Sequence, residues 1–125
     1  MNLLLDTHIF LWCILEDPKL TKKAKDLISK ADQVYISSAS IWELAIKRNL
    51  NKWEGSIEDL IHSIADSGFY ELPIKNQHAA TILQLPDLHK DPFDRLLIAQ
   101  SISEPLIFLT ADKQLEKYSS LVTLI

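Results

Sequence analysis

Four acidic side chains, distributed over most of the 125-residue chain, are the residues best suited to chemistry. Asp6 directly follows a short apolar run and Asp112 lies just beyond another, and both runs have the composition of buried strands. Glu43 and Asp94 lie near the starts of two apolar helical segments. If the strands are parallel, their carboxyl ends meet at one edge of the sheet, where ligands bind in such folds. The four carboxylates are therefore expected to converge on one site.

A group of converging carboxylates needs a source of positive charge. Like charges placed together repel and raise one another's pKa unless something neutralises them. Hard cations such as Mg²⁺ and Mn²⁺ are the natural partners of carboxylate oxygens. A cation held in this way can position a phosphate group, activate water and stabilise a leaving oxyanion, so the pattern favours phosphodiester hydrolysis. For any single acid, capping a helix or lying in its first turn is an equally good explanation.

Short apolar runs alternate with helical segments along the chain. Strands are predicted at residues 3–5, 34–36, 70–72, 106–109 and 121–125. Helices are predicted at residues 7–15, 21–28, 56–65, 76–83, 93–103 and 114–117, and another helix runs to about residue 49. Residues 37–40 offer several cap candidates for that helix, and Ser40 and Glu43 also have the spacing of a capping box. The alternation predicts one α/β domain over residues 1–125, with a central, mostly parallel sheet and helices on both faces.

The composition is that of an ordinary globular protein. Apolar residues make up 47% and charged residues 24%, and only two glycines are present, which excludes disordered and collagen-like chains. Cys13 has no partner for an internal disulfide, which fits a reducing cytosol. Without a signal peptide or a long apolar run, a soluble cytoplasmic protein with no membrane association is expected. The net charge of −4 argues against a high-affinity, non-specific nucleic-acid binder.

Four segments together resemble one family of nucleases. In chain order they are Leu3-Leu-Leu-Asp-Thr-His8, Ile36-Ser-Ser-Ala-Ser-Ile-Trp-Glu-Leu-Ala-Ile-Lys47, Asp91-Pro-Phe-Asp-Arg-Leu-Leu-Ile-Ala-Gln100 and Leu109-Thr-Ala-Asp112. Their sequences, order and separations are similar to those of PIN-domain nucleases, and more closely to those of VapC-type toxins of prokaryotic toxin–antitoxin systems. The resemblance implies a three-layer α/β/α PIN domain with Mg²⁺- or Mn²⁺-dependent endoribonuclease activity. It also implies a homodimer and a cognate antitoxin that blocks the site.

The resemblance also implies roles for individual acids. Residue by residue, the acidic quartet of the family falls on Asp6, Glu43, Asp94 and Asp112. Asp6 is expected to bind the metal ion directly, and Asp94 and Asp112 to bind it directly or through water. Glu43 is expected to hold metal-bound waters or a second cation. Hydrolysis by metal-activated water would leave a 5′-phosphate and a 3′-hydroxyl without any need for histidine.

Four further residues have roles that the sequence leaves open. Asp91 is an alternative third acid, although its place before a proline also suits a helix N-cap. Thr110 occupies the place of a family serine or threonine that hydrogen-bonds near the last aspartate. Lys47 follows Glu43 by four positions, which favours an ion pair, yet it could also meet phosphate. Arg95 could contact an RNA phosphate, pair with Asp91 or pair with an acid of the antitoxin.

The histidines and tryptophans have structural explanations. His8 could reach the acids but is expected to pack near a strand end, and His62 is expected to be solvated. His78 and His89 could suggest zinc, but no second pair of ligands has suitable spacing. The three tryptophans are expected to pack in the core or in a subunit interface rather than to stack on bases. They are Trp12, Trp42 and Trp53.

Two other functions compete with the nuclease toxin. A catalytically inactive PIN-like module that only binds a partner would lack at least one acid, whereas all four are present. A relative acting on DNA or flap substrates would need extra acids and a helical arch, for which 125 residues leave little space. Single-stranded RNA and structured RNA such as tRNA are both compatible substrates.

Overall fold

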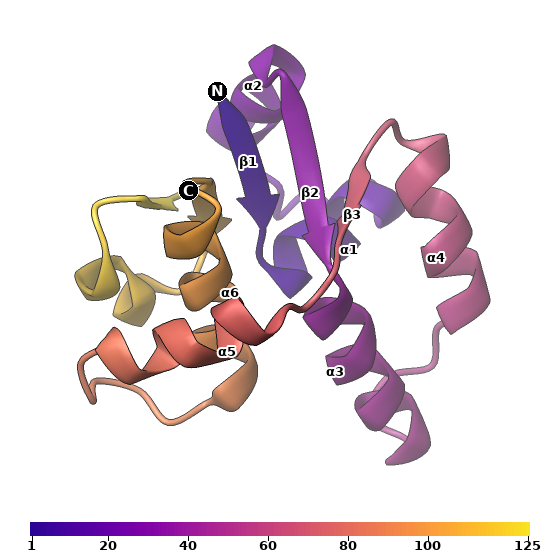
Figure 1. Cartoon of the computed structure of the whole chain (residues 1–125). Helices are drawn as coiled ribbons and strands as arrows, with labels where there is room; N and C mark the ends of the chain where they lie inside the picture. Colours follow the sequence, from indigo (N-terminus) through magenta and orange to yellow (C-terminus); the bar gives the residue numbers. More distant parts are fainter.

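The computed structural model, which describes residues 1–125, has a five-stranded sheet at its centre and helices on both faces (Figure 1). The strand order is β3-β2-β1-β4-β5, and every neighbouring pair is parallel. The strands are β1 (Asn2–Leu5), β2 (Gln33–Ser37), β3 (Tyr70–Leu72), β4 (Ile107–Thr110) and β5 (Val122–Leu124). The predicted three-layer α/β/α architecture is therefore confirmed, and the sheet is wholly rather than mostly parallel.

Helices connect the strands, as a parallel sheet requires. They are α1 (Thr7–Leu15), α2 (Lys22–Lys30), α3 (Ser38–Asn49), α4 (Ile57–Asp66), α5 (Asn76–Thr81) and α6 (Pro92–Ser103), with two 3₁₀ segments, η1 (Ile82–Gln84) and η2 (Lys113–Tyr118). The predicted helices agree with these to within a few residues, except that the last one is a 3₁₀ segment. None of the helices combines the length and the apolar character that crossing a membrane requires.

The central strand β1 is buried on both faces. Leu3, Leu4 and Leu5 all have 0% exposure. Because successive side chains of a strand point to opposite faces, Leu4 packs into a hydrophobic cluster with residues of α6, while Leu3 and Leu5 pack into a second cluster with residues of α1, α2 and α4. Because β1 is held between both helical layers, the residue that follows it, Asp6, lies in a fixed position at the carboxyl edge of the sheet.

Helix α3 begins after the first of its candidate caps, and the predicted capping box of Ser40 and Glu43 is wrong. Ser37 is the N-cap, and its hydroxyl accepts a hydrogen bond from the Ala39 N–H (3.0 Å). Ser37 takes this role because it is also the last residue of β2, so the strand turns directly into the helix. Ser40 then lies inside the helix and is fully buried. Glu43 therefore does not cap the helix, and its carboxylate is available for other contacts.

A series of buried polar groups links α3 to α6. The Ser37 hydroxyl donates to Oε1 of Gln100 (2.5 Å), and Nε2 of Gln100 lies 3.3 Å from Nδ1 of His78. That nitrogen accepts the Lys75 N–H (3.0 Å), so the ring proton is on Nε2, which donates to Oε2 of Glu104 (2.6 Å). Both ring nitrogens of His78 are thus engaged within the fold. His78 therefore has no free ring nitrogen with which to bind zinc.

Replacing Ser37 with alanine is expected to destabilise the protein by about 2 kcal/mol, because the α3 cap is lost and Oε1 of buried Gln100 loses its donor. Urea unfolding followed by circular dichroism measures the change. Ser38→Ala, one residue along and without a side-chain hydrogen bond, is the matched control and should be near neutral. Equal effects of the two substitutions would contradict the structural role of Ser37.

Candidate active site

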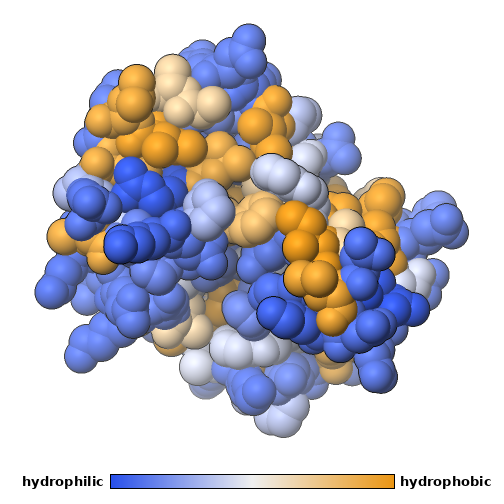
Figure 2. Space-filling model, turned by 90° about the horizontal axis from the view of Figure 1, so that it is seen from below, coloured by the Kyte–Doolittle hydropathy of each residue, from blue (hydrophilic) through white to orange (hydrophobic).

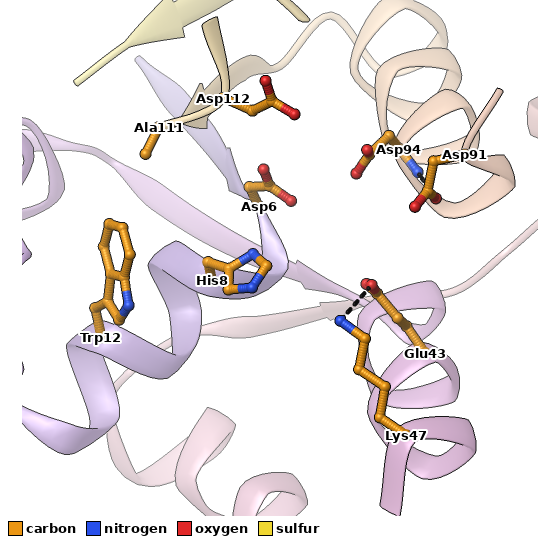
Figure 3. A pocket seen from close by; sticks show the side chains of 9 residues that line it. All are labelled: Asp6, His8, Trp12, Glu43, Lys47, Asp91, Asp94, Ala111 and Asp112. Atoms are coloured by element: carbon orange, nitrogen blue, oxygen red, sulfur yellow. Dashed lines mark hydrogen bonds and ion pairs between the residues drawn. The ribbon is translucent and has the colours of Figure 1, made fainter. Parts of the chain in front are cut away.

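A pocket of about 330 Å³ opens at the carboxyl edge of the sheet (Figure 3). Four separate parts of the chain contribute its lining, which consists of Asp6, His8, Trp12, Glu43, Lys47, Asp91, Asp94, Ala111 and Asp112. Figure 3 shows the carboxylates of these parts facing a common space. All four acids of the predicted quartet and the alternative acid, Asp91, therefore lie in one pocket.

Asp6 is buried and held through both carboxylate oxygens. Its Oδ1 accepts the Thr7 N–H (2.8 Å), which makes Asp6 the N-cap of α1, and its Oδ2 accepts the Thr110 hydroxyl (2.7 Å). Burial raises the pKa of the Asp6 carboxyl, while the hydrogen bonds from Thr110 and Thr7 act in the opposite direction. Each oxygen accepts only one of these hydrogen bonds and so retains a lone pair that can bind a cation.

Glu43 is 9% exposed and is positioned by a partner on each oxygen. The Thr7 hydroxyl donates to Oε1 (2.9 Å), and this hydroxyl also lies 2.8 Å from Oγ of Ser40. Nζ of Lys47 lies 3.1 Å from Oε2, so the ion pair predicted from the spacing along the helix is confirmed (Figure 3). These contacts fix the carboxylate of Glu43 at the pocket wall.

Asp91 and Asp94 differ in what their carboxylates do. Oδ1 of Asp91 accepts the N–H groups of Phe93 (2.8 Å) and Asp94 (3.1 Å), so Asp91 caps α6. The Asp94 side chain is 19% exposed and its carboxylate contacts His89. Burial raises the pKa of Asp94 to about 7, the negative charges of Asp6 and Asp91 add to the rise, and His89 opposes it. Asp94 is thus held where its ionised form is disfavoured, as is typical of carboxylates at functional sites.

Asp112 extends the acidic surface from the end of β4. Its N–H donates to Oγ1 of Thr110 (3.0 Å), and its Oδ1 accepts the Gln114 N–H (3.0 Å). Thr110 therefore contacts two of the acids, since its hydroxyl also donates to Asp6. One ligand atom each of His89, Asp94 and Asp112 lie within 4.8 Å of one another. Asp6 and Glu43 stand around the same pocket but outside this tightest group.

Arg95 contacts the loop before α6. Its Nη1 donates to the carbonyl oxygens of Pro86 (3.0 Å) and His89 (3.4 Å) and to the Tyr118 hydroxyl (3.4 Å). It forms no ion pair with Asp91, which was one of its expected partners. The Arg95 side chain therefore braces the loop over residues 86–91.

The expectation that His8 packs near a strand end is wrong, because its side chain is exposed and lines the pocket. Trp42 was expected in the core or in a subunit interface. It is 54% exposed and makes an edge contact with Phe93, with ring centroids 4.9 Å apart, so it does not pack in the core, and its place in an interface stays a prediction. His62 is solvated, as predicted.

Sequence reasoning missed Thr7 and His89. Thr7 directly follows Asp6, so its position was the available signal, and its hydroxyl reaches Glu43 across 36 residues of chain. His89 was considered only as half of a zinc pair with His78. The loop instead brings Nε2 of His89 to 2.9 Å from Oδ2 of Asp94. The available signal in the sequence was that His89 lies five residues before Asp94 in the same segment.

The donor set of the pocket fits a hard divalent cation. Its polar lining is dominated by carboxylates, which are the ligands that Mg²⁺ and Mn²⁺ favour. The raised pKa values of Asp6 and Asp94 show that the fold holds these groups where ionisation is unfavourable without added positive charge. A bound cation would supply that charge.

Comparisons with known proteins agree with this geometry. The family model described as PIN domain matches residues 3–121, a range that contains every acid of the pocket. A curated relative, ribonuclease VapC22 of Mycobacterium tuberculosis, is 29% identical over 120 residues, which cover 94% of this chain and 92% of that protein.

Solved structures share the fold at low sequence identity. VapBC2 of Rickettsia felis, bound to a DNA fragment from its promoter, matches with a TM-score of 0.73 and 19% identity over 98% of this chain and 96% of that chain. FitAcB of Neisseria gonorrhoeae matches with a TM-score of 0.60 and 20% identity over 92% of this chain and 90% of that one.

Asp94→Asn is expected to stabilise the metal-free protein at high pH. With a pKa of about 7 against an ordinary value of 3.8, the folded protein holds a proton that the unfolded chain releases as the pH rises above 4. The stability that this proton confers is present at low pH and is lost as the pH rises through 7. A neutral amide avoids the loss, so the variant should gain about 1–2 kcal/mol at pH 8.

Urea unfolding between pH 4 and pH 8 in the presence of a chelator measures this effect. Asp66→Asn, at the exposed end of α4, is the control and should follow the wild-type pH profile. A variant at position 94 that is no more stable than the wild type at pH 8 would contradict the electrostatic strain assigned to Asp94.

Proposed function

Because the chain belongs to the PIN-domain family, we propose that it is a divalent-metal-dependent endoribonuclease and the toxin of a toxin–antitoxin system. The family resemblance predicted from four sequence segments is confirmed by the match over residues 3–121. The observation that carries the activity is the pocket in which Asp6, Glu43, Asp94 and Asp112 meet. The name of the M. tuberculosis relative, a ribonuclease, supports RNA as the substrate.

Asp6, Asp94 and Asp112 would hold the cation, which we propose to be Mg²⁺, with Mn²⁺ able to replace it. When bound, such an ion supplies positive charge for the scissile phosphate, for the attacking water and for the leaving oxygen. The fold of the protein fixes where the carboxylate oxygens of these three residues lie. Thr110 orients Asp6 and Asp112 by hydrogen bonds of 2.7 Å and 3.0 Å.

Glu43 is the group proposed to orient the attacking water. With Oε1 held by Thr7 and Oε2 by Lys47, its carboxylate has a fixed direction and can accept a hydrogen bond from water. Water attacks phosphorus and loses a proton to solvent, the bond from phosphorus to the 3′-oxygen breaks, and the 3′-oxygen takes up a proton from solvent. The products are a 5′-phosphate and a 3′-hydroxyl. Lys47, which lines the pocket and is 35% exposed, is also placed to contact a phosphate.

Two surfaces support the proposed protein partners. An exposed apolar face of α3 consists of Trp42 (54% exposed) and Ile46 (38%), and Leu50 (57%) at the C-cap extends it by another four residues. Such a face would meet a second copy of the chain. A groove of about 400 Å³ lies between α1 and α4, and Leu11 and Trp53 are among its lining residues. It would take a segment of the antitoxin. Seen from the carboxyl edge, apolar surface gathers in separate patches among hydrophilic residues (Figure 2).

The relatives also support an antitoxin partner. The R. felis structure is of VapBC2, and another structure of similar fold is a toxin–antitoxin complex from Klebsiella pneumoniae. We therefore propose that a cognate antitoxin binds this chain, and the exposed apolar face of α3 leads us to propose a homodimer as well. A cytoplasmic location would give it access to RNA and suits its single, half-buried cysteine.

Asp6→Asn is expected to reduce Mg²⁺-dependent cleavage of RNA by at least on the order of a hundredfold, because a buried carboxylate that faces the cation loses its charge. The amide still caps α1, so circular dichroism and the unfolding midpoint should show an intact fold. Cleavage is measured with labelled single-stranded RNA, tRNA and flapped DNA, and the product ends are mapped.

Asp66→Asn is the control for loss of one negative charge and should cleave as the wild type does. Unchanged Mg²⁺-dependent cleavage by Asp6→Asn would refute the assignment of the site. Cleavage of flapped DNA but not of RNA would instead support a DNA-acting nuclease. Binding of a partner without cleavage of any of the three nucleic acids would support the inactive module.

Ile46→Glu is expected to convert the proposed homodimer into a monomer, since it places a charge in the middle of the exposed apolar face of α3. Light scattering coupled to size-exclusion chromatography measures the mass. Ile61→Glu replaces an equally large, 49% exposed side chain on α4 and should leave the dimer unchanged. A dimer that survives at position 46 would exclude this face as the interface.

A further inference from the structure

One imidazole faces the acids from a loop that the proposed mechanism does not use. His89 lies between η1 and α6, and its side chain is 24% exposed. Its Nε2 is 2.9 Å from Oδ2 of Asp94, and both residues have a ligand atom within 4.8 Å of one of Asp112. Two separate segments of the chain thus bring three donor atoms to one place, and one of them is a nitrogen.

The distance between Nε2 of His89 and Oδ2 of Asp94 suits two ligands of one ion. Two neighbouring ligands at about 2.1 Å from an octahedral cation are roughly 3.0 Å apart. Without the ion, a proton between the nitrogen and the carboxylate occupies the same 2.9 Å gap. Exchanging that proton for a cation therefore requires little movement of either side chain.

The backbone of His89 is fixed by side chains from two other elements. Its carbonyl oxygen accepts the Tyr118 hydroxyl of η2 (3.2 Å) and lies 3.4 Å from Nη1 of Arg95 in α6. Tyr118 is 8% exposed, so this anchor belongs to the core. Arg95 also binds the carbonyl oxygen of Pro86 at the other end of the loop (3.0 Å). A ring on a restrained backbone can act as a ligand at a low cost in ordering.

We infer that His89 is a nitrogen ligand which, with Asp94 and Asp112, raises the affinity of this metal centre for a first-row transition ion such as Mn²⁺, while its carboxylates still accept Mg²⁺. The inference rests on the proposed function, because it concerns the metal ion of the same pocket. Mg²⁺ prefers oxygen ligands, whereas imidazole favours transition ions. The chain therefore discriminates more strongly between Mn²⁺ and Mg²⁺ than a site made of carboxylates alone.

Pulsed electron paramagnetic resonance of Mn²⁺ bound to the full chain tests this inference. The wild type should show coupling of the ion to a directly bound ¹⁴N nucleus, and His89→Gln should lose it. In His89→Gln the dissociation constant of Mn²⁺ should rise on the order of tenfold, with a smaller change for Mg²⁺. His62→Gln, on the exposed face of α4, and His8→Gln, in the pocket, should keep the coupling.

Three outcomes would overturn the inference. A wild-type protein that binds Mn²⁺ without ¹⁴N coupling has a site of oxygens alone, which leaves the proposed nuclease intact. Coupling that vanishes in His8→Gln and persists in His89→Gln assigns the nitrogen to the other histidine. A chain that binds no Mn²⁺ overturns both this inference and the proposed metal dependence. Because the bound ion is measured, and not RNA cleavage, the two proposals fail in distinguishable ways.

Discussion

Burial of several carboxylates in one pocket is the constraint on which the rest of the structure depends. Asp6 and Glu43 are 6% and 9% exposed, so water solvates their carboxylates poorly. The fold compensates with hydroxyl and amide donors and with Lys47, while burial and then the charges of Asp6 and Asp91 raise the pKa of Asp94 to about 7. Such a site is stable only because the surrounding core holds its backbone in place. A divalent ion of the kind proposed for this pocket would relieve the strain that remains.

The part of this arrangement that follows from topology could be predicted from the sequence. Alternation of apolar runs and helical segments gave the parallel sheet, and the carboxyl edge of a parallel sheet is a fixed meeting place. Asp6 and Asp112 were placed there because they follow strands. Asp91 before a proline was correctly considered as a helix cap, since that role depends only on local backbone geometry.

Features that depend on contacts between distant segments could not be predicted in this way. Ser37 and Ser40 are both plausible caps for α3, and only the place where β2 ends decides between them. The hydrogen bond from Thr7 to Glu43 and the approach of His89 to Asp94 depend on how helices and loops sit on the sheet. The spacing of apolar residues along the sequence carries no information about such distances. Trp42 could not be assigned to the core or to an interface, because a large apolar residue in a helix does not reveal whether another layer covers it.

The buried polar series from α3 to α6 has an evolutionary consequence. Ser37, Gln100, His78 and Glu104 pair each donor with an acceptor in a fixed direction. Exchanging one member alone leaves a buried neighbour without its partner, whereas exchanging several at once can preserve the pairing or replace it with apolar contacts. Related sequences should therefore vary at these positions as a correlated set. A change at the start of α3 is thereby tied to a compensating change in α6.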